Sequence, residues 1–399
     1  MASAGPISVS PGGRYFLDGS GDPFFWLGDT QWELVRLPPL DDVAAILEDR
    51  RSRGFSVLQV MLTGVGDGTG ANVSGHTPWR DSGPLVPNER YFAHVDAALE
   101  LCRSSGLIVA LGLYHQLHDA RVTPASARQW ARWVAQRCGD MPNLVWAMYP
   151  RAEQGFVPVV RELAAGLKEG DGGAHPITVH PDPSPATSSL LFNEPWMAFH
   201  SIQTWADTDL IAPMVAHDYR LEPAKPVVMA EGAYEAGEEY GFEVTPLWVR
   251  RQAYWSYLAG GHHSYGHNDL WRLPSRWREA LDAPGAAHLA ILRHVLTSLS
   301  EWWSLVPDPS LIVGCEACDP AMNTAARHVS GRWGLVYMGE GGGVSVALSA
   351  LRAGSGIIAK WVDPTTGDTE PAGSFEVSDT VRLCAPPAWE DALLVLEAG

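Results

Sequence analysis

Glu231 directly follows the apolar run Pro226–Ala230. A run of this kind is typical of a buried strand, so the side chain that follows it lies at the edge of a sheet and is partly removed from water. A carboxylate in that place can act as a nucleophile or exchange protons with a bound molecule. The alternative is a surface salt bridge. We favour the catalytic interpretation, because a partly desolvated acid is costly to the fold unless it is used.

A second carboxylate is needed for hydrolysis of a glycosidic bond, in which one group attacks and the other donates a proton. Glu153 follows the apolar run Asn143–Met148 and is the predicted proton donor. Its alternative role is that of a first-turn acid, stabilised by the dipole of the next helix. Glu194 belongs to an Asn-Glu-Pro triplet like the one that carries the acid in cellulase-type barrels. It lies between two runs, so Glu153 is the stronger candidate.

Polar and aromatic side chains near the ends of the other apolar runs could hold a sugar, and Gln59 could point inward from within its run. Hydrogen bonds to sugar hydroxyl groups are the use that we expect for the histidines among them. The predicted substrate-binding residues are Asp29, Trp32, Gln59, His115, His180, Gln203, Tyr234, Glu235, Tyr265 and His267.

No metal or other cofactor is predicted. His115 and His118 have a spacing that suits a helix, but they follow a strand, and the adjacent His262 and His263 point to opposite faces of one. Neither pair has the His-x-x-x-His spacing of a helical zinc site. The Cys-x-x-Cys sequence at 315–318 has no second pair to complete a zinc site.

The candidate residues follow apolar runs that alternate with amphipathic helices. The runs lie at 24–28, 57–62, 107–113, 143–148, 176–180, 198–203, 226–230 and 260–265, and the helices at 41–53, 89–105, 126–137, 157–168, 214–219, 246–258 and 286–302. Strands apolar on both faces, each in a strand–helix unit, predict an α/β fold of the (β/α)8 TIM barrel type, whose site lies at the carboxyl ends of the strands. A doubly wound open sheet is the alternative, but no Gly-x-Gly-x-x-Gly follows a strand.

The pattern changes after Pro307, where helical periodicity stops. Short apolar runs such as Leu335–Tyr337 and Leu393–Leu396 are separated by turn residues, among them Gly341–Gly343. This pattern predicts a small antiparallel β-sandwich. We therefore expect a barrel domain over 1–307 and a β-sandwich domain over 308–399.

Composition excludes several classes of protein. The formal net charge is −18, which repels nucleic acid, and no apolar run is long enough to span a membrane. The five cysteines are too few for a disulfide framework, and the N-terminal segment has neither a charged leader nor an apolar stretch. We expect a cytoplasmic protein whose partner is a carbohydrate or glycoside substrate, with no nucleic acid and no membrane involved.

Several stretches along nearly the whole chain resemble one known family. They are Arg14–Phe16, Gly28–Trp32, Arg53–Val60, Asn143–Trp146, His175–Pro181, Glu194–Trp196, Ile202-Gln203, Lys225–Glu231, Tyr234-Glu235, Tyr265–His267, Trp302–Pro307 and Trp361–Gly367. Together they resemble the apiosidase-like glycoside hydrolases, in which a barrel precedes a C-terminal β-domain of the collagen-binding type. The resemblance implies that Glu231 is the nucleophile and that Glu194 is not catalytic.

The sequence departs from this family after the fourth strand. The family places Gly-Gly-Asp there, with the Asp as acid/base, whereas this chain has Tyr149-Pro150-Arg151. Either Glu153 or a residue elsewhere takes the role, or the protein is not a conventional glycosidase. We expect a retaining, exo-acting glycoside hydrolase for a furanosidic or deoxy-sugar glycoside. A catalytically inactive carbohydrate-binding barrel and a sugar lyase or isomerase are the alternatives. The C-terminal domain is expected to pack on the barrel rather than to bind collagen.

Overall fold

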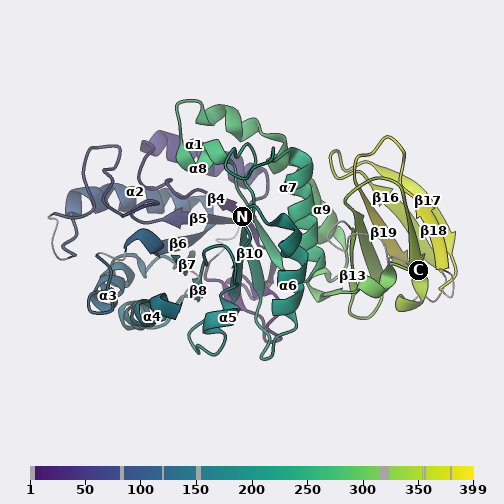
Figure 1. Ribbon diagram of the computed structural model, residues 1–399, viewed down its shortest axis with the longest axis horizontal. Coiled ribbons are helices and arrows are strands. Elements are labelled where there is room, and N and C mark those ends of the chain that lie inside the picture. The colour runs from purple at the N-terminus through teal and green to yellow at the C-terminus, as the bar shows by residue number, and fades with distance from the viewer. Residues whose placement is uncertain are drawn as a thin grey trace.

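A closed parallel sheet forms the first part of the molecule (Figure 1). The computed structural model describes residues 5–80, 85–118, 121–149, 154–313, 323–352, 354, 356–377 and 380–399. In their order in the sheet, the strands are β8 (Ile177–Val179), β7 (Leu144–Tyr149), β6 (Ile108–His115), β5 (Val57–Met61), β4 (Leu27–Thr30), β11 (His262–Tyr265), β10 (Val227–Glu231) and β9 (His200–Gln203). The two end strands meet where Ala198 N donates to the Ile177 carbonyl at 2.8 Å. The predicted TIM barrel is confirmed.

Helices surround this sheet, and most of them follow a strand. They are α1 (Leu40–Ser52), α2 (Glu89–Ser105), α3 (Ala127–Cys138), α4 (Val157–Asp171), α5 (Ser188–Leu191), α6 (Ile211–Tyr219), α7 (Pro246–Leu258), α8 (Asn268–Arg272) and α9 (Pro284–Ser298). Short 3₁₀ helices lie at Gln116–His118, Gln154–Phe156, Thr208–Leu210, Trp277–Asp282, Trp302–Ser304, Pro309–Leu311 and Leu348–Ala350. The short α5 and α8 were not predicted, because neither is long enough to give an amphipathic period.

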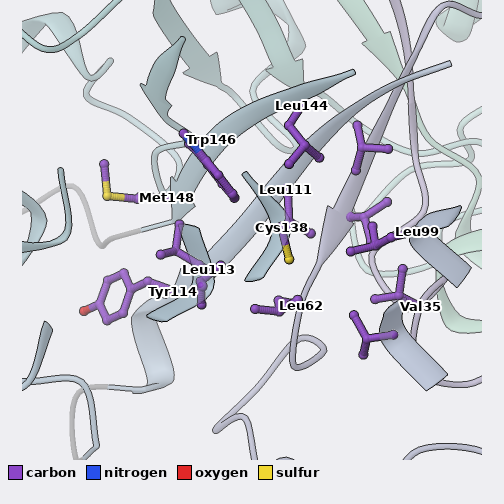
Figure 2. Packing of buried hydrophobic residues seen from close by; sticks show 14 of the residues in the cluster. Val35, Leu62, Leu99, Leu111, Leu113, Tyr114, Cys138, Leu144, Trp146 and Met148 are labelled. Carbon is purple, nitrogen blue, oxygen red and sulfur yellow. The ribbon is translucent and has the colours of Figure 1, made fainter. Parts of the chain in front are cut away.

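Buried apolar side chains between strands and helices explain the continuous apolar runs. Leu99 of α2 and Cys138 of α3 belong to one buried cluster with Leu111 of β6 and Trp146 of β7 (Figure 2). Other residues of the same strands, such as Ala110 and Val145, face a second cluster inside the barrel. Strands with both faces buried carry mostly apolar residues, which is the pattern seen in β6 and β7, whereas β9 and β11 also contain buried polar residues.

A small N-terminal sheet packs against one end of the barrel. It consists of β1 (Ser8–Val9), β2 (Phe16–Leu17) and β3 (Pro23–Phe24), paired in antiparallel fashion. The Phe16 ring packs on Trp26 and Phe199, with ring centroids 4.9 and 5.1 Å away. The predicted first strand over 24–28 is therefore wrong at its start, because Phe24 pairs in this small sheet and β4 begins only at Leu27. With this end covered, the carboxyl ends of the strands are left for chemistry.

Antiparallel sheets form the C-terminal part of the chain. The larger sheet has the order β12 (Leu305–Pro307), β13 (Asn323–His328), β14 (Trp333–Met338), β19 (Ala392–Ala398), β16 (Ile357–Val362) and β17 (Thr369–Phe375), and the smaller one pairs β15 (Gly343–Ala347) with β18 (Thr380–Cys384). Side chains from both sheets share one buried cluster, including Val336, Val346 and Leu394. The antiparallel β-sandwich predicted after the barrel is confirmed, and its first strand begins already at Leu305.

The two parts of the chain share a buried interface formed by α7 on the barrel side (Figure 1). Asp391 accepts hydrogen bonds from Arg250 Nη2 and from the Tyr337 hydroxyl, each at 2.7 Å. The rings of Tyr254 and Tyr337 stack beside this pair, with centroids 4.2 Å apart. Because one hydrophobic cluster contains residues of both parts, such as Tyr254 and Leu393, their cores are continuous.

A search of the described residues for a helix long and apolar enough to cross a membrane finds none.

Candidate active site

Glu231 is the last residue of β10, and its buried carboxylate is held by side chains from neighbouring strand ends. Gln203, the last residue of β9, donates from Nε2 to Glu231 Oε1 at 2.9 Å. The Tyr149 hydroxyl, from the end of β7, donates to Oε2 at 3.4 Å. His180 Nε2 lies 3.5 Å from the same oxygen. Four consecutive strands of the closed sheet thus place polar groups around one carboxylate, because their carboxyl ends meet at one edge.

Burial dominates the electrostatics of this carboxylate. Removal from water raises the pKa of Glu231 to about 8, although hydrogen bonds from Tyr234 and Tyr149 favour the ionised form. The carboxylates of Asp182 and Glu239 raise it further through charge repulsion. His180 does not counter this effect, because burial lowers its pKa to about 3 and leaves it neutral. Burial therefore favours the protonated form of Glu231 in the free protein.

Tyr149 is a site residue that the sequence analysis treated only as a departure from the family pattern. Its hydroxyl donates to Gln203 Oε1 at 2.8 Å, so it orients the amide that in turn binds Glu231. Its ring lies 4.2 Å from that of His180 and 5.1 Å from that of His115, between ring centroids. The available signal was its place directly after the apolar run 143–148, where an aromatic side chain is easily taken for core.

Trp32 and Tyr234 complete the surroundings of Glu231. The indole Nε1 of Trp32 donates to the Tyr234 hydroxyl at 3.2 Å, and Tyr234 is hydrogen-bonded to the Glu231 carboxylate. The Trp32 ring packs edge-on against His180, with centroids 5.3 Å apart. Of the predicted substrate-binding residues, Trp32, His180, Gln203 and Tyr234 are therefore brought together at Glu231.

Asp29, Glu235 and Tyr265 lie in a different cluster, which centres on the buried guanidinium of Arg50 in α1. Asp29 Oδ2 is 3.7 Å from Arg50 Nη1 and accepts a hydrogen bond from Gln31 Nε2 at 2.8 Å. Burial raises the pKa of Asp29 to about 6. Glu235 accepts from the Tyr265 hydroxyl at 2.6 Å and from the first turn of α9 at Gly285 N. Asp29 Oδ1 and Arg50 Nη1 are buried without a hydrogen-bond partner among the described residues, and the contact of Asp29, Glu235 and Tyr265 with substrate stays a prediction.

The remaining predicted residues lie at other positions. Gln59 points into the barrel and donates to the Ala230 carbonyl at 2.9 Å, just below Glu231. His115 is buried next to Tyr149, and burial lowers its pKa to about 4. His267 accepts from Asp269 N and so caps α8. Glu153 and the cysteine pair at 315–318 lie outside the described residues.

Glu194, the glutamate of the Asn-Glu-Pro triplet, lies away from this site. Its carboxylate accepts from Arg161 Nε at 2.7 Å and from Trp196 Nε1 at 2.8 Å. In the part of the chain that the structure describes, no three His, Cys, Asp or Glu side chains are grouped so as to hold a metal ion. The site thus offers acid–base and nucleophilic chemistry by one buried carboxylate with a set of hydrogen-bonding groups.

A TIM barrel can host many kinds of enzyme, so the class of this one comes from the family comparison. Residues 10–304 match the family described as "Apiosidase-like, catalytic domain", and residues 306–397 match the "Putative collagen-binding domain of a collagenase". The chain belongs to the apiosidase-like family and is a glycosidase. The resemblance seen in the sequence is confirmed.

Solved structures share the whole fold. One named "Glycoside hydrolase" has a TM-score of 0.90 and 24% sequence identity, over 100% of this chain and 98% of its own. A glycoside hydrolase family 5 structure from Bacteroides vulgatus ATCC 8482 has a TM-score of 0.88 and 23% identity, over 99% of this chain and 94% of its own. Among curated proteins, no sequence matches this chain.

Proposed function

We propose that this glycosidase is a retaining, exo-acting enzyme that removes a furanosidic sugar or a deoxy-sugar, with Glu231 as the nucleophile. The observation that carries the proposal is the Glu231 carboxylate, buried at the end of β10 and bound by Gln203 and Tyr149. In a retaining mechanism, one positioned carboxylate acts as the nucleophile and forms a covalent glycosyl-enzyme. The departure from the family at 149–151 removes the family's aspartate as proton donor, and its Tyr149 contacts the Glu231 carboxylate.

In the proposed reaction, a Glu231 oxygen attacks the anomeric carbon and forms a covalent glycosyl-enzyme. Gln203 Nε2 holds Oε1, while the Tyr149 hydroxyl and His180 Nε2 lie next to Oε2. We propose that Glu153 protonates the leaving oxygen and then accepts a proton from the water that hydrolyses the intermediate. His180, Tyr234 and Trp32 surround the carboxylate and would contact the hydroxyl groups of the attacked sugar.

Mass-spectrometric analysis of products from a panel of aryl glycosides tests this function. Aryl furanosides and aryl deoxy-glycosides should yield the free sugar with one added water. Binding without turnover would indicate an inactive carbohydrate-binding barrel. A product without added water would indicate a lyase or an isomerase. Either of these two results would contradict the proposal.

The fall of kcat/KM at low pH should report the protonation of Glu231. A nucleophile must be ionised, and the pKa of this carboxyl in the free protein is raised to about 8. We expect kcat/KM to fall about tenfold per pH unit below that value. Tyr149→Phe removes a hydrogen bond that favours the ionised form, so this fall should move to higher pH. A profile that is flat between about pH 5 and 8 would contradict the assignment.

The proton donor can be identified by varying the leaving group. Glu153→Ala should lower kcat/KM about 10²- to 10⁴-fold for sugar leaving groups and much less for activated aryl groups, which leave without protonation. Asp182 follows β8, and its carboxylate acts on Glu231, so Asp182→Asn is the matched comparison. It should affect both substrate types equally. Selective loss in Asp182→Asn instead, with Glu153→Ala unselective, would transfer the role to Asp182.

A further inference from the structure

Trp205 is a large aromatic side chain that the described chemistry does not use. It lies two residues beyond Gln203, the residue that binds Glu231, and its side chain is 38% exposed. The intervening Thr204 donates from its backbone N to the Glu231 carbonyl at 2.9 Å. The backbone from which Trp205 projects is thus tied directly to the candidate nucleophile.

The backbone of Trp205 adopts an unfavourable conformation. Its φ angle is +53°, in the left-handed region that residues with a Cβ rarely occupy. The adjacent turn, in which Asp207 N donates to the Thr204 carbonyl at 3.0 Å, encloses this residue. Glycine would adopt this conformation without strain. The backbone conformation therefore does not explain why a tryptophan is present. Such residues are concentrated at functional sites.

Aromatic rings connect Trp205 with the catalytic carboxylate. The Trp205 ring packs edge-on against Tyr240, with centroids 5.3 Å apart, and Tyr240 lies 6.4 Å from Tyr234. Tyr234 is hydrogen-bonded to Glu231. The exposed indole is therefore the outer end of a row of contacting aromatic rings, which leads through the buried Tyr240 and Tyr234 to the carboxylate.

We propose that Trp205 is a binding platform for the sugar that leaves, so that the substrate is an oligosaccharide and not a glycoside with a small aglycone. The proposal rests on the exo-acting function. In such an enzyme the terminal sugar is bound at Glu231, and the rest of the substrate lies on the other side of the scissile bond. The apolar C–H face of a sugar ring packs on an indole through dispersion and burial of apolar area. Only the Tyr240 ring separates the exposed Trp205 from Tyr234 at Glu231. Trp205 therefore lies where the next sugar of the substrate would bind.

The test compares two substrates that carry the same terminal sugar, a disaccharide and a methyl glycoside. The panel contains apiofuranosyl, arabinofuranosyl, rhamnosyl and fucosyl compounds of each type. Trp205→Gly should lower kcat/KM about 5- to 30-fold for the disaccharide, mainly through KM, and less than about twofold for the methyl glycoside. Trp205→Phe should restore part of the loss. Ile358→Ala, which removes an exposed apolar side chain of the C-terminal part, should change neither value.

Trp205→Gly relieves the positive φ but loses the packing on Tyr240 and frees the unfolded chain, so its melting temperature should lie close to that of the wild type. A lower one, with equal losses on both substrates, would show a structural role and overturn the proposal. Unchanged hydrolysis of the disaccharide would also overturn it. If the wild type hydrolyses no member of the panel, the proposed function itself fails, a result distinct from hydrolysis that is insensitive to Trp205.

Discussion

Glu231→Gln is expected to lower kcat about 10³-fold or more and, in the same variant, to stabilise the fold at neutral pH. The amide cannot attack the anomeric carbon, so no glycosyl-enzyme forms. It retains an oxygen in the place of Oε1, which can still accept the hydrogen bond from Gln203 Nε2. The local structure should therefore survive the substitution, and the loss of activity reports on chemistry.

The gain in stability follows from the raised pKa of this carboxyl. Its ordinary value is 4.5, and in the folded protein it is about 8. Between these two values the folded state holds a proton that the unfolded state has lost, so raising the pH favours unfolding. The wild type should lose on the order of a few kcal/mol of stability from this group between about pH 4.5 and 8. The amide that replaces the carboxyl in the variant does not titrate, so the variant should not lose this stability as the pH rises.

Urea unfolding of the wild type and the variant at pH 4.5 and at pH 8 measures the effect. The two proteins should differ little at the lower pH, and the variant should be the more stable at the higher pH. Glu194→Gln, which alters a glutamate paired with Arg161 away from the site, should change neither activity nor the pH dependence. Near-full activity of Glu231→Gln would exclude Glu231 as the nucleophile. Equal stability differences at both pH values would show that its carboxyl is not buried in solution.

The barrel could be predicted from the sequence because buried parallel strands carry an unmistakable pattern. The run Val227–Ala230 is apolar on both faces and identified β10 to within one residue, since Glu231 ends that strand. The C-terminal sheets were recognisable from the loss of helical period and the turn residues. The start of β4 was missed because Phe24 and Leu27 belong to one apolar run and yet pair in different sheets.

The site was predicted only in part, because the end of a strand does not fix the direction of a side chain. Asp29 and Glu231 both lie at or near strand ends, but Asp29 pairs with Arg50 of α1 and Glu231 pairs with Gln203 of β9. Arg50 gave no sign in the sequence that it is buried. Tyr149 was overlooked because an aromatic residue next to an apolar run was taken for a core residue. Its hydroxyl nevertheless orients Gln203.

Asp391→Ala should destabilise the whole protein by about 3–5 kcal/mol, because it breaks a buried ion pair at the interface between the barrel and the C-terminal sheets. Both side chains are almost inaccessible, at 2% exposure for Arg250 and 1% for Asp391. Without the carboxylate, the guanidinium of Arg250 stays buried with little compensation, and the Tyr337 hydroxyl loses its acceptor. Arg250 cannot turn to solvent, since α7 packs directly on β13 and β14.

Glu390→Ala is the matched control, because this neighbour lies 3.4 Å from the same guanidinium but is 68% exposed. An exposed pair of this kind contributes about 1 kcal/mol at most, so the control should melt close to the wild type. Since the two parts share one hydrophobic cluster, calorimetry should show a single transition that moves down as a unit in Asp391→Ala. Two separate transitions, with only the weaker one shifted, would show that the C-terminal sheets are an independent module. The proposal that they serve to pack on the barrel, and not to bind collagen, would then fail.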